Sequence, residues 1–308
     1  MVHIFLGFLM LFVPISDIED DLTITHENQP IATVNRADFI NDTLGREMVD
    51  LEAFDQFVEH IDQLTFEPPV NAHIDKLGNI VSEQVGYRLH KQHFKKLFYQ
   101  YYYGKGAMEM EVPHQTLHPR VDSELLSDIR VQRIGQYVTY FNSRNKPRSH
   151  NIKLATEAIN NQVIFPGETF SFNQIVGKRT KERGYLPAPV IVRGELSEGI
   201  GGGICQVSST LYNAVDHAGL EIVQRYSHSR RVPYVPSGRD ATVSWYGPDF
   251  VFRNELNQPI LLQAKVYGGS MSVIVLSSDS INFENRRVPG APHKLPKEVH
   301  IDEQRLVE

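Results

Sequence analysis

The chain contains a single cysteine, Cys205, among its 308 residues, and this limits how its fold can be stabilised. One cysteine cannot form an internal disulfide, and it cannot build the multi-cysteine zinc or iron–sulfur sites that staple many small domains. The fold must therefore depend on a hydrophobic core. Hydrophobic residues make up 41% of the chain and charged residues 22%, which is typical of a soluble globular protein with one large domain or two ordinary ones.

The net charge of the chain argues against a nucleic-acid partner. The 31 basic and 37 acidic residues give a formal net charge of -6. No basic excess is therefore available to offset the phosphates of a nucleic acid. We expect no nucleic-acid partner.

The N-terminus begins with an apolar run from Ile4 to Ile15, interrupted by Gly7 and Pro14. This run is too short to span a bilayer as a helix, but its length fits the core of a signal peptide. No Lys or Arg precedes it and no small-x-small cleavage site follows it, so a buried strand or helix is the alternative. We interpret residues 1–16 as an export signal or a short anchor.

Residues 17–132 are predicted to form a small α+β module. Apolar residues recur at helical spacing over 51–64 and 91–104, while 66–74 and 108–112 have the pattern of strands. The second helix carries a run of tyrosines, at 99 and 101–103, that can either stack on sugars or divide between core and solvent. We favour the division between core and solvent.

Residues 133–280 have a β-rich pattern, with helices expected to pack on a sheet. A polar loop precedes a predicted helix at 151–161, and Tyr267–Ser270 has the composition of a tight hairpin turn. The predicted strands are 133–141, 187–196, 220–226, 241–246, 249–253, 259–267 and 271–278. The fold class is therefore α+β, and residues 281–308 are expected to be a flexible tail because they are rich in Pro, His and charge.

The segment around Cys205, GGGICQVSSTLYNA, combines a glycine loop with the start of a helix. Apolar residues follow at helical spacing, and Gly219 stands where a C-terminal cap is expected. Cys205 should therefore lie in or just before the first turn, where free N–H groups and the helix dipole lower a thiol pKa. Gly202 and Gly203 allow a substrate carbonyl to approach and N–H groups to face an oxyanion. A buried, inert cysteine is an equally good interpretation of this stretch.

A nucleophilic cysteine needs a base, and His228 is the best candidate. It follows the strand that returns from the Cys205 helix, and such a return can bring the strand end beside the helix start. His150 is the second candidate. His217 is excluded because it lies at the far end of the helix, roughly 18 Å from Cys205 at 1.5 Å per residue.

A third group is needed to orient the imidazole. Asp240, in a loop before a predicted strand, is plausible in this role, and its neighbour Arg239 has the planar fork that suits a substrate carboxylate. A simple surface ion pair between these two residues is at least as good an interpretation. Ser229 and Tyr212 are further polar groups within reach of the site.

Several segments in order resemble a VanW domain, over about 133–280. They are FPGETFSFNQIVG, RGYLPAP, GGGICQVSSTLYNA, AGLEIV, HS with VPYVPSGRDATV, and FRNELNQPILLQA. The family is named for a gene in glycopeptide-resistance clusters of Gram-positive bacteria, and is proposed to have an L,D-transpeptidase fold. Residues 50–128 more weakly resemble the peptidoglycan-binding-like module often found ahead of VanW domains. The clear transmembrane anchor that is usual in the family is not evident here.

The resemblance implies that Cys205 is the nucleophile and His228 its partner, with Asp240 completing the catalytic group. Its motifs also point to a set of candidate substrate-binding or oxyanion residues, which are Gly202, Gly203, Gln206, Ser229 and Arg239. The implied reaction forms 3→3 peptidoglycan cross-links through a Cys205 thioester and uses no metal or organic cofactor.

The resemblance also implies partners and a location. The expected partners are peptidoglycan stem peptides, with association at the cell wall or membrane surface and no specific protein partner. The expected location is the extracellular face of the cytoplasmic membrane or the cell wall. Two alternatives remain, namely a non-catalytic peptidoglycan-binding or accessory glycopeptide-resistance protein, and a Cys/His hydrolase of wall peptides.

Overall fold

The computed structural model describes residues 20–41, 48–192 and 195–293. The chain divides into two compact units, the first containing residues up to 71 and 83–120, the second containing 72–82 and 121 onward. Within the described residues, no helix is both long and apolar enough to cross a bilayer. The apolar segment predicted as an export signal, residues 1–16, lies outside the described residues.

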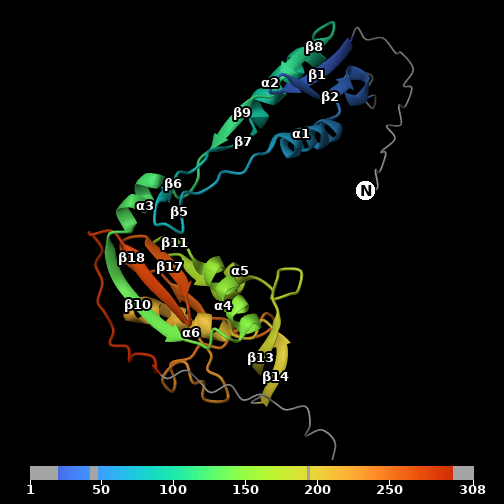
Figure 1. The fold of residues 1–308 in the computed structure, drawn as a ribbon. Helices are drawn as coiled ribbons and strands as arrows, with labels where there is room; N and C mark the ends of the chain where they lie inside the picture. Colours follow the sequence, from blue (N-terminus) through green and yellow to red (C-terminus); the bar gives the residue numbers. More distant parts are fainter. Residues whose placement is uncertain (1–19, 42–47, 193–194, 294–308) are drawn as a thin grey trace, which may run out of the picture. The chain divides into compact units, whose positions relative to one another are not determined.

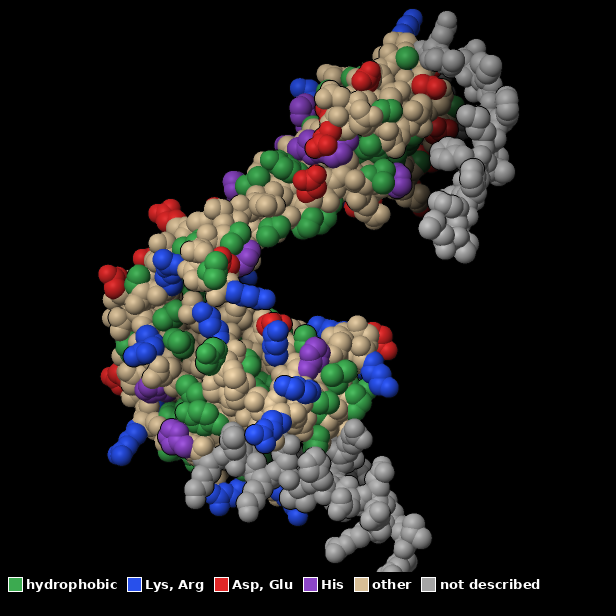
Figure 2. Space-filling model, in the orientation of Figure 1, with side chains coloured by type: hydrophobic (Ala, Val, Ile, Leu, Met, Phe, Trp, Pro, Cys, Tyr) green, Lys and Arg blue, Asp and Glu red, His purple; other side chains and the backbone are tan. Residues whose placement is uncertain are grey.

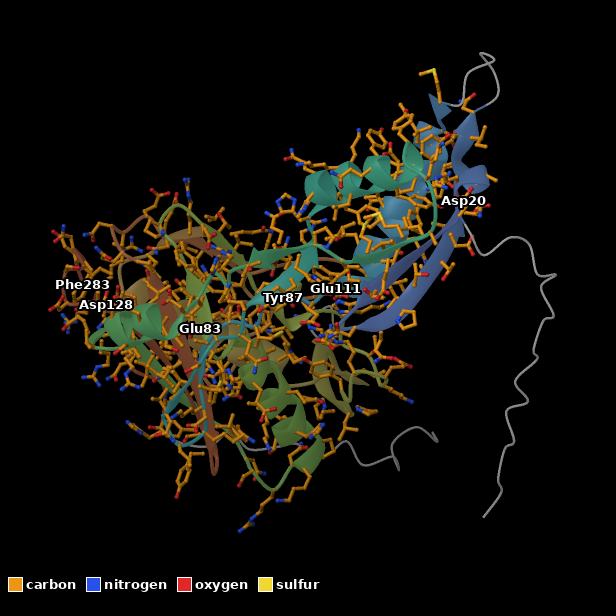
Figure 3. The ribbon with its side chains drawn as sticks, turned by 90° about the horizontal axis from the view of Figure 1, so that it is seen from above. Asp20, Glu83, Tyr87, Glu111, Asp128 and Phe283 are labelled. Carbon is orange, nitrogen blue, oxygen red and sulfur yellow. The ribbon has the colours of Figure 1, made fainter. Side chains whose placement is uncertain are left out.

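The first unit places two helices against a small sheet with strand order β2-β1-β8 (Figure 1). Its elements are β1 (Asp21–His26), β2 (Gln29–Asn35), the 3-10 helix η2 (Arg36–Phe39), β3 (Ile40–Asn41), β4 (Met48–Val49), α1 (Leu51–Thr65), β7 (Gly86–Leu89), α2 (Lys91–Tyr102), β8 (Met108–Glu111) and β9 (His114–Leu117). Asp20, which precedes β1, and Glu111, the last residue of β8, are labelled in Figure 3.

The core of the first unit is built by aromatic side chains on facing helices. The Asp50 side chain caps α1 by accepting from Glu52 N and Ala53 N, and Phe54 follows on the buried face. The Phe54 and Phe98 rings lie 4.6 Å apart between centroids. This packing agrees with the predicted helices at 51–64 and 91–104.

The tyrosine run of α2 is divided between core and solvent, as the favoured interpretation predicted. Tyr101 and Tyr102 are buried, and their hydroxyls donate to Asp20 O at 2.5 Å and Met48 O at 3.3 Å. Tyr103 is exposed. The buried tyrosines are therefore structural.

The second unit is centred on an antiparallel sheet of order β10-β18-β17-β11 (Figure 1). Its elements are β5 (His73–Ile74), β6 (Ile80–Val81), α3 (Ser123–Ile129), β10 (Gln132–Tyr140), α4 (Lys146–Ile159), β11 (Gln162–Ile164), β12 (Thr169–Ser171), α5 (Phe172–Val176), β13 (Pro187–Val192), β14 (Glu195–Ile200), α6 (Ile204–His217), β15 (Glu221–Gln224), β16 (Val251–Arg253), β17 (Ile260–Tyr267) and β18 (Ser270–Ser277). The predicted α+β class is confirmed.

The two faces of this sheet pack against different partners because strand side chains alternate. On β18, Val273 and Val275 join the cluster that contains residues of α4 and α6, whereas Leu276 joins the cluster with α3 and the β5–β6 hairpin. The hairpin and α3 therefore belong to the second unit, which differs from the boundary after residue 132 predicted from the sequence.

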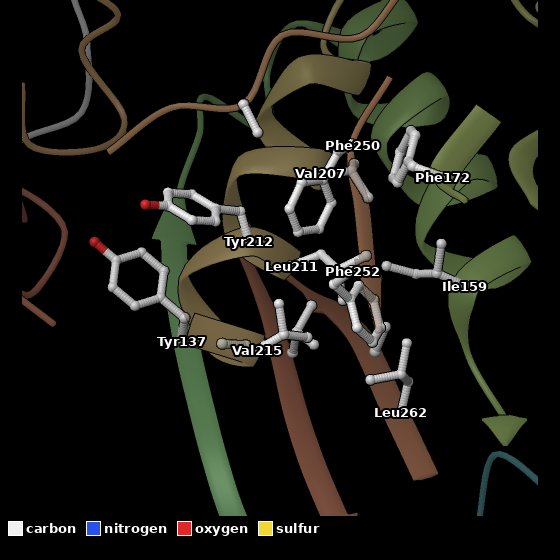
Figure 4. Packing of buried hydrophobic residues seen from close by; sticks show 14 of the residues in the cluster. Tyr137, Ile159, Phe172, Val207, Leu211, Tyr212, Val215, Phe250, Phe252 and Leu262 are labelled. Atoms are coloured by element: carbon white, nitrogen blue, oxygen red, sulfur yellow. The ribbon is translucent and has the colours of Figure 1, made fainter. Parts of the chain in front are cut away.

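Helix α6 packs on the sheet and is buried over nearly its whole length. Figure 4 shows Val207, Leu211 and Val215 facing Phe250, Phe252 and other side chains of the core. A Cβ on Gly135 of β10 would lie 2.4 Å from Ala214 O, so glycine is needed for this close approach of strand and helix. The predicted placement of the cysteine-bearing helix on the sheet is confirmed.

Three predictions for the second unit differ from the structure. Helix α4 begins at Lys146, not at 151, because Asn145 caps it and Pro147 is accepted in the first turn. Residues 241–246 form no strand, since they cross the start of α6 as a loop. The predicted flexible tail is packed over 281–293, where Ile281 is buried; residues 294–308 lie outside the described residues.

Candidate active site at the start of helix α6

The glycine loop presents Cys205 in the first turn of α6. Gly203 is the N-cap with φ 106°, a left-handed conformation that favours glycine, and no side chain caps the helix. A Cβ on Gly202 would lie 2.5 Å from Ala188 O, so the backbone of this loop lies close against the backbone of β13. Cys205 is the second helical residue and is partly buried. Two N–H groups of the first turn are used within it, since Ile204 N donates to Gly201 O at 3.3 Å and Gln206 N donates to Gly203 O at 3.0 Å.

Cys205, His228 and Asp240 lie together, as the sequence predicted. The carboxylate of Asp240 accepts from the His228 ring nitrogen Nδ1 at 2.7 Å, and the same oxygen accepts from the His228 backbone N–H at 2.6 Å. The imidazole also lies close enough to Cys205 for the two side chains to shift each other's pKa. Because Nδ1 is engaged by Asp240, Nε2 is the ring nitrogen left for the thiol. Cys205 Sγ lies 3.6 Å from Val243 O.

The electrostatics of the site favour a thiolate beside an imidazolium. Burial raises the pKa of Cys205, but the hydrogen bond and charge of His228 outweigh it, so the pKa of the thiol is lowered. Burial lowers the pKa of His228, yet its hydrogen bonds with Asp240 and Cys205 raise it to about 9. Burial likewise raises the pKa of Asp240, and the bonds from His228 more than reverse this. The thiolate favoured by these shifts is the form in which a cysteine is nucleophilic.

Two serines on α6 hold the Asp240 loop against the helix. Ser208 Oγ donates to Ala241 O at 2.6 Å, and Ala241 N donates to Ser209 Oγ at 2.9 Å. Both serines are fully buried. Sequence reasoning did not assign them a role, although a run of small polar residues on an otherwise apolar buried helix was a usable signal.

The Arg239 side chain is bonded to α6, and its predicted role beside a substrate carboxylate stays a prediction. Its guanidinium donates to Asn213 Oδ1 at 2.8 Å and to Asp216 Oδ2 at 2.6 Å, and it lies over the Tyr212 ring. The predicted alternative, an ion pair with Asp240, is not formed, because Asp240 faces His228. Arg239 therefore anchors the loop that carries Asp240.

Gln206 and Ser229, which were also predicted to contact the substrate, have different surroundings. Gln206 is buried, its amide nitrogen donates to Thr139 Oγ1 and Tyr140 O, each at 3.0 Å, and its oxygen accepts from Arg148 at 2.6 Å. With these bonds the amide joins α6 to β10, and its predicted substrate role has no support from its contacts. Ser229 is exposed and, in the described part of the chain, has no hydrogen bond to Cys205 or His228.

The other candidate histidines lie away from the thiol. His150 Nε2 is 2.9 Å from Gly184 O on an exposed surface. His217 Nδ1, at the far end of α6, is 3.3 Å from Gln136 O. His228 is therefore the histidine that the fold brings to Cys205.

Arg179 is a residue near the site that sequence reasoning missed. Its terminal nitrogens, Nη1 and Nη2, are buried and have no hydrogen-bond partner among the described residues. Its charge also acts on the pKa of Cys205. The basic run KRTKER, residues 178–183, was the available signal.

Groups of side chains that can share a cation lie in the first unit. Among the described residues these are His26 with Glu111 and His114, and His26 with Glu27 and Glu67. Neither group includes Cys205.

Comparison with known proteins identifies the family of this chain. The family described as VanW like protein matches residues 147–276, a range that contains Cys205, His228 and Asp240. Uncharacterized protein YoaR of Bacillus subtilis (strain 168) is 56% identical over 303 residues, which cover 98% of this chain and 100% of that protein. Vancomycin B-type resistance protein VanW of Enterococcus faecalis (strain ATCC 700802 / V583) is 36% identical over 110 residues, covering 34% of this chain and 40% of that protein. No solved structure matches the chain significantly. The chain belongs to the VanW family.

Proposed function

We propose that this protein is a cell-wall cysteine acyltransferase that acts as an L,D-transpeptidase on peptidoglycan stem peptides. The observation that carries the proposal is the placement of Cys205, at the start of α6, beside His228, whose ring nitrogen Nδ1 is hydrogen-bonded to the Asp240 carboxylate. A thiolate at the positive end of a helix and a base held by a carboxylate supply the nucleophile and the proton carrier that acyl transfer requires.

In the first half-reaction, the Cys205 thiolate attacks the carbonyl carbon of the third stem residue. The new S–C bond forms as the C–N bond to the terminal D-alanine breaks, and the His228 imidazolium gives its proton to the departing amine. A thioester on Cys205 and free D-alanine result. Asp240 keeps the imidazole oriented and stabilises its charged form.

In the second half-reaction, an amine from another stem attacks the thioester. Neutral His228 takes the proton that this amine loses, the C–S bond breaks, and the Cys205 thiolate is restored. The product is a 3→3 cross-link. Water in place of the amine would release a shortened stem without a cross-link.

The name of the enterococcal relative refers to vancomycin resistance, which supports a substrate in the cell wall. With such a substrate, the proposed location is the wall or the outer face of the cytoplasmic membrane. The first unit is proposed to hold the protein on peptidoglycan.

The proposal is tested by incubating purified protein with disaccharide-tetrapeptides. Wild type and the control His150→Ala should release D-alanine and form dimers, because His150 is exposed and bonded elsewhere. Cys205→Ala should do neither. Equal product from wild type and Cys205→Ala refutes the proposal, and shortened stems without dimers would indicate a hydrolase.

A further inference from the structure

Arg179 carries a charge that its surroundings leave unpaired. Nη1 and Nη2 are buried and have no hydrogen-bond partner in the described ranges. Burying an ionised group without a partner is costly, so such groups in proteins are normally paired. Two other arginines near α6 obey this rule, since Arg148 donates to Gln206 and Arg239 to Asp216. The exception at Arg179 therefore needs an explanation.

The side chain of Arg179 packs against the loop that leads to Cys205. A Cβ placed on Gly201 would lie 3.1 Å from Arg179 Cβ and 3.2 Å from its Cγ. The guanidinium carbon lies 5.7 Å from the Phe172 ring centroid, which gives it an apolar wall. Burial lowers the pKa of Arg179, and Arg183 acts in the same direction, whereas the ionised forms of Tyr185, Cys205 and Asp249 raise it. The unpaired cation thus lies within electrostatic range of the thiol.

The surroundings of Arg179 also favour an anionic ligand. The same segment contains Lys178, Lys181 and Arg183, and Lys178 Nζ lies over the Tyr246 ring at 5.2 Å. Lys and Arg side chains are spread over the face of the second unit shown in Figure 2, with fewer Asp and Glu side chains. A surface of one sign raises the local concentration of oppositely charged ligands.

We infer that Arg179 binds the C-terminal carboxylate of the residue that leaves during acylation. This rests on the proposed function and names what its acyl donor must contain. A guanidinium fork matches a carboxylate in two parallel hydrogen bonds. In a stem tetrapeptide, one carbon separates that carboxylate from the scissile amide nitrogen. Holding it beside the glycine loop therefore brings the scissile carbonyl to Sγ of Cys205.

This assignment has a consequence for specificity. The enzyme removes a single C-terminal residue, and a stem whose last carboxyl is amidated or extended leaves Arg179 unpaired.

The test compares two peptides on the non-reacting Cys205→Ala protein by titration calorimetry. One is the stem tetrapeptide with a free C-terminal carboxylate, and the other is the same peptide as its carboxamide. The carboxylate should bind at least tenfold more tightly. Adding Arg179→Gln should reduce this ratio to about one, whereas adding Arg144→Gln, which removes an exposed charge outside this segment, should preserve it.

Equal affinity for the two peptides, no measurable binding of the carboxylate form, or an unchanged ratio in Arg179→Gln overturns the inference. If Arg179→Gln does not fold, the comparison of the two peptides on Cys205→Ala and the variant Arg179→Lys, which should bind the carboxylate more weakly, decide it. Acylation of Cys205 in the wild-type protein is measured separately by mass. If the protein prefers the carboxylate peptide but forms no thioester on Cys205, only the proposed function is refuted. If a thioester forms but the carboxylate peptide is not preferred, only the role of Arg179 is refuted.

Discussion

Replacing Asp240 by asparagine separates the charge of the carboxylate from its geometry. One carboxylate oxygen of Asp240 accepts from both the backbone N–H and Nδ1 of His228, at 2.6 Å and 2.7 Å. An asparagine oxygen can occupy the same place and accept both bonds. Asp240→Asn therefore keeps the contacts and removes the negative charge.

The size of the effect follows from the imidazole. Burial lowers the pKa of His228, and the hydrogen bond with Asp240 is the largest influence that raises it, from an ordinary 6.5 to about 9. At about 1.4 kcal/mol per pKa unit, this shift is on the order of 3–4 kcal/mol in favour of the imidazolium. Because the bond with Asp240 is the largest of the influences that raise the pKa, its loss should cost on the order of 1–2 kcal/mol, or roughly a tenfold smaller population of the thiolate–imidazolium pair.

The assay is the rate of alkylation of Cys205 by iodoacetamide between pH 5 and 10. Wild type should have an apparent thiol pKa below the ordinary value, and Asp240→Asn should move it upward by about one unit. Asp216→Asn is the matched control, because it removes the same charge from a residue that pairs with Arg239 and Arg286 instead. An unchanged or lowered thiol pKa in Asp240→Asn would refute this account of how the thiol is activated.

Three further predictions concern the framework of the site. Gly202→Ala should destabilise the protein by about 1–3 kcal/mol in denaturant unfolding, because its Cβ would lie 2.5 Å from Ala188 O; Gly247→Ala, with ordinary contacts, should be close to neutral. Gln206→Leu should cost about 1–3 kcal/mol in the same measurement, since the partners of a buried amide are left unsatisfied. The pKa of Asp240 is lowered in the folded protein, so its contribution to stability is present above its ordinary 3.8 and lost as pH falls below that value. Wild type should consequently lose more stability than Asp240→Asn between pH 5 and pH 3, and parallel pH curves would contradict this.

Much of the fold followed from hydrophobic periodicity. Helix α6, its Gly219 terminus and the β17–β18 hairpin all agree with the predictions, because long periodic segments and glycine-containing turns give strong local signals. The β1–β2 hairpin was missed although Leu22 and Ile24 alternate with polar residues. Its turn is formed by Glu27 and Asn28, both at positive φ. Glutamate is rarely found in such turns, so the sequence contains no turn signal there.

Part of the site could be predicted from the order of helices and strands along the chain. A helix followed directly by a returning strand places His228 near the helix start, so its pairing with Cys205 could be anticipated. The partner of each carboxylate could not be predicted. Asp240 is the sequence neighbour of Arg239, yet in the folded chain Arg239 pairs with Asp216 on α6 and Asp240 pairs with His228. Arg179 lies in a loop with no periodicity, and its lack of a partner is a property of the folded chain.

The most direct test of the central claim is the intact mass of the protein after mixing with a stem tetrapeptide. Acyl transfer predicts that wild type gains the mass of the peptide minus D-alanine, on Cys205, and that hydroxylamine removes this adduct as expected of a thioester. His228→Ala should form it far more slowly and Cys205→Ala not at all. An adduct that persists in Cys205→Ala, or no adduct on wild type under conditions where the peptide is bound, would contradict the account.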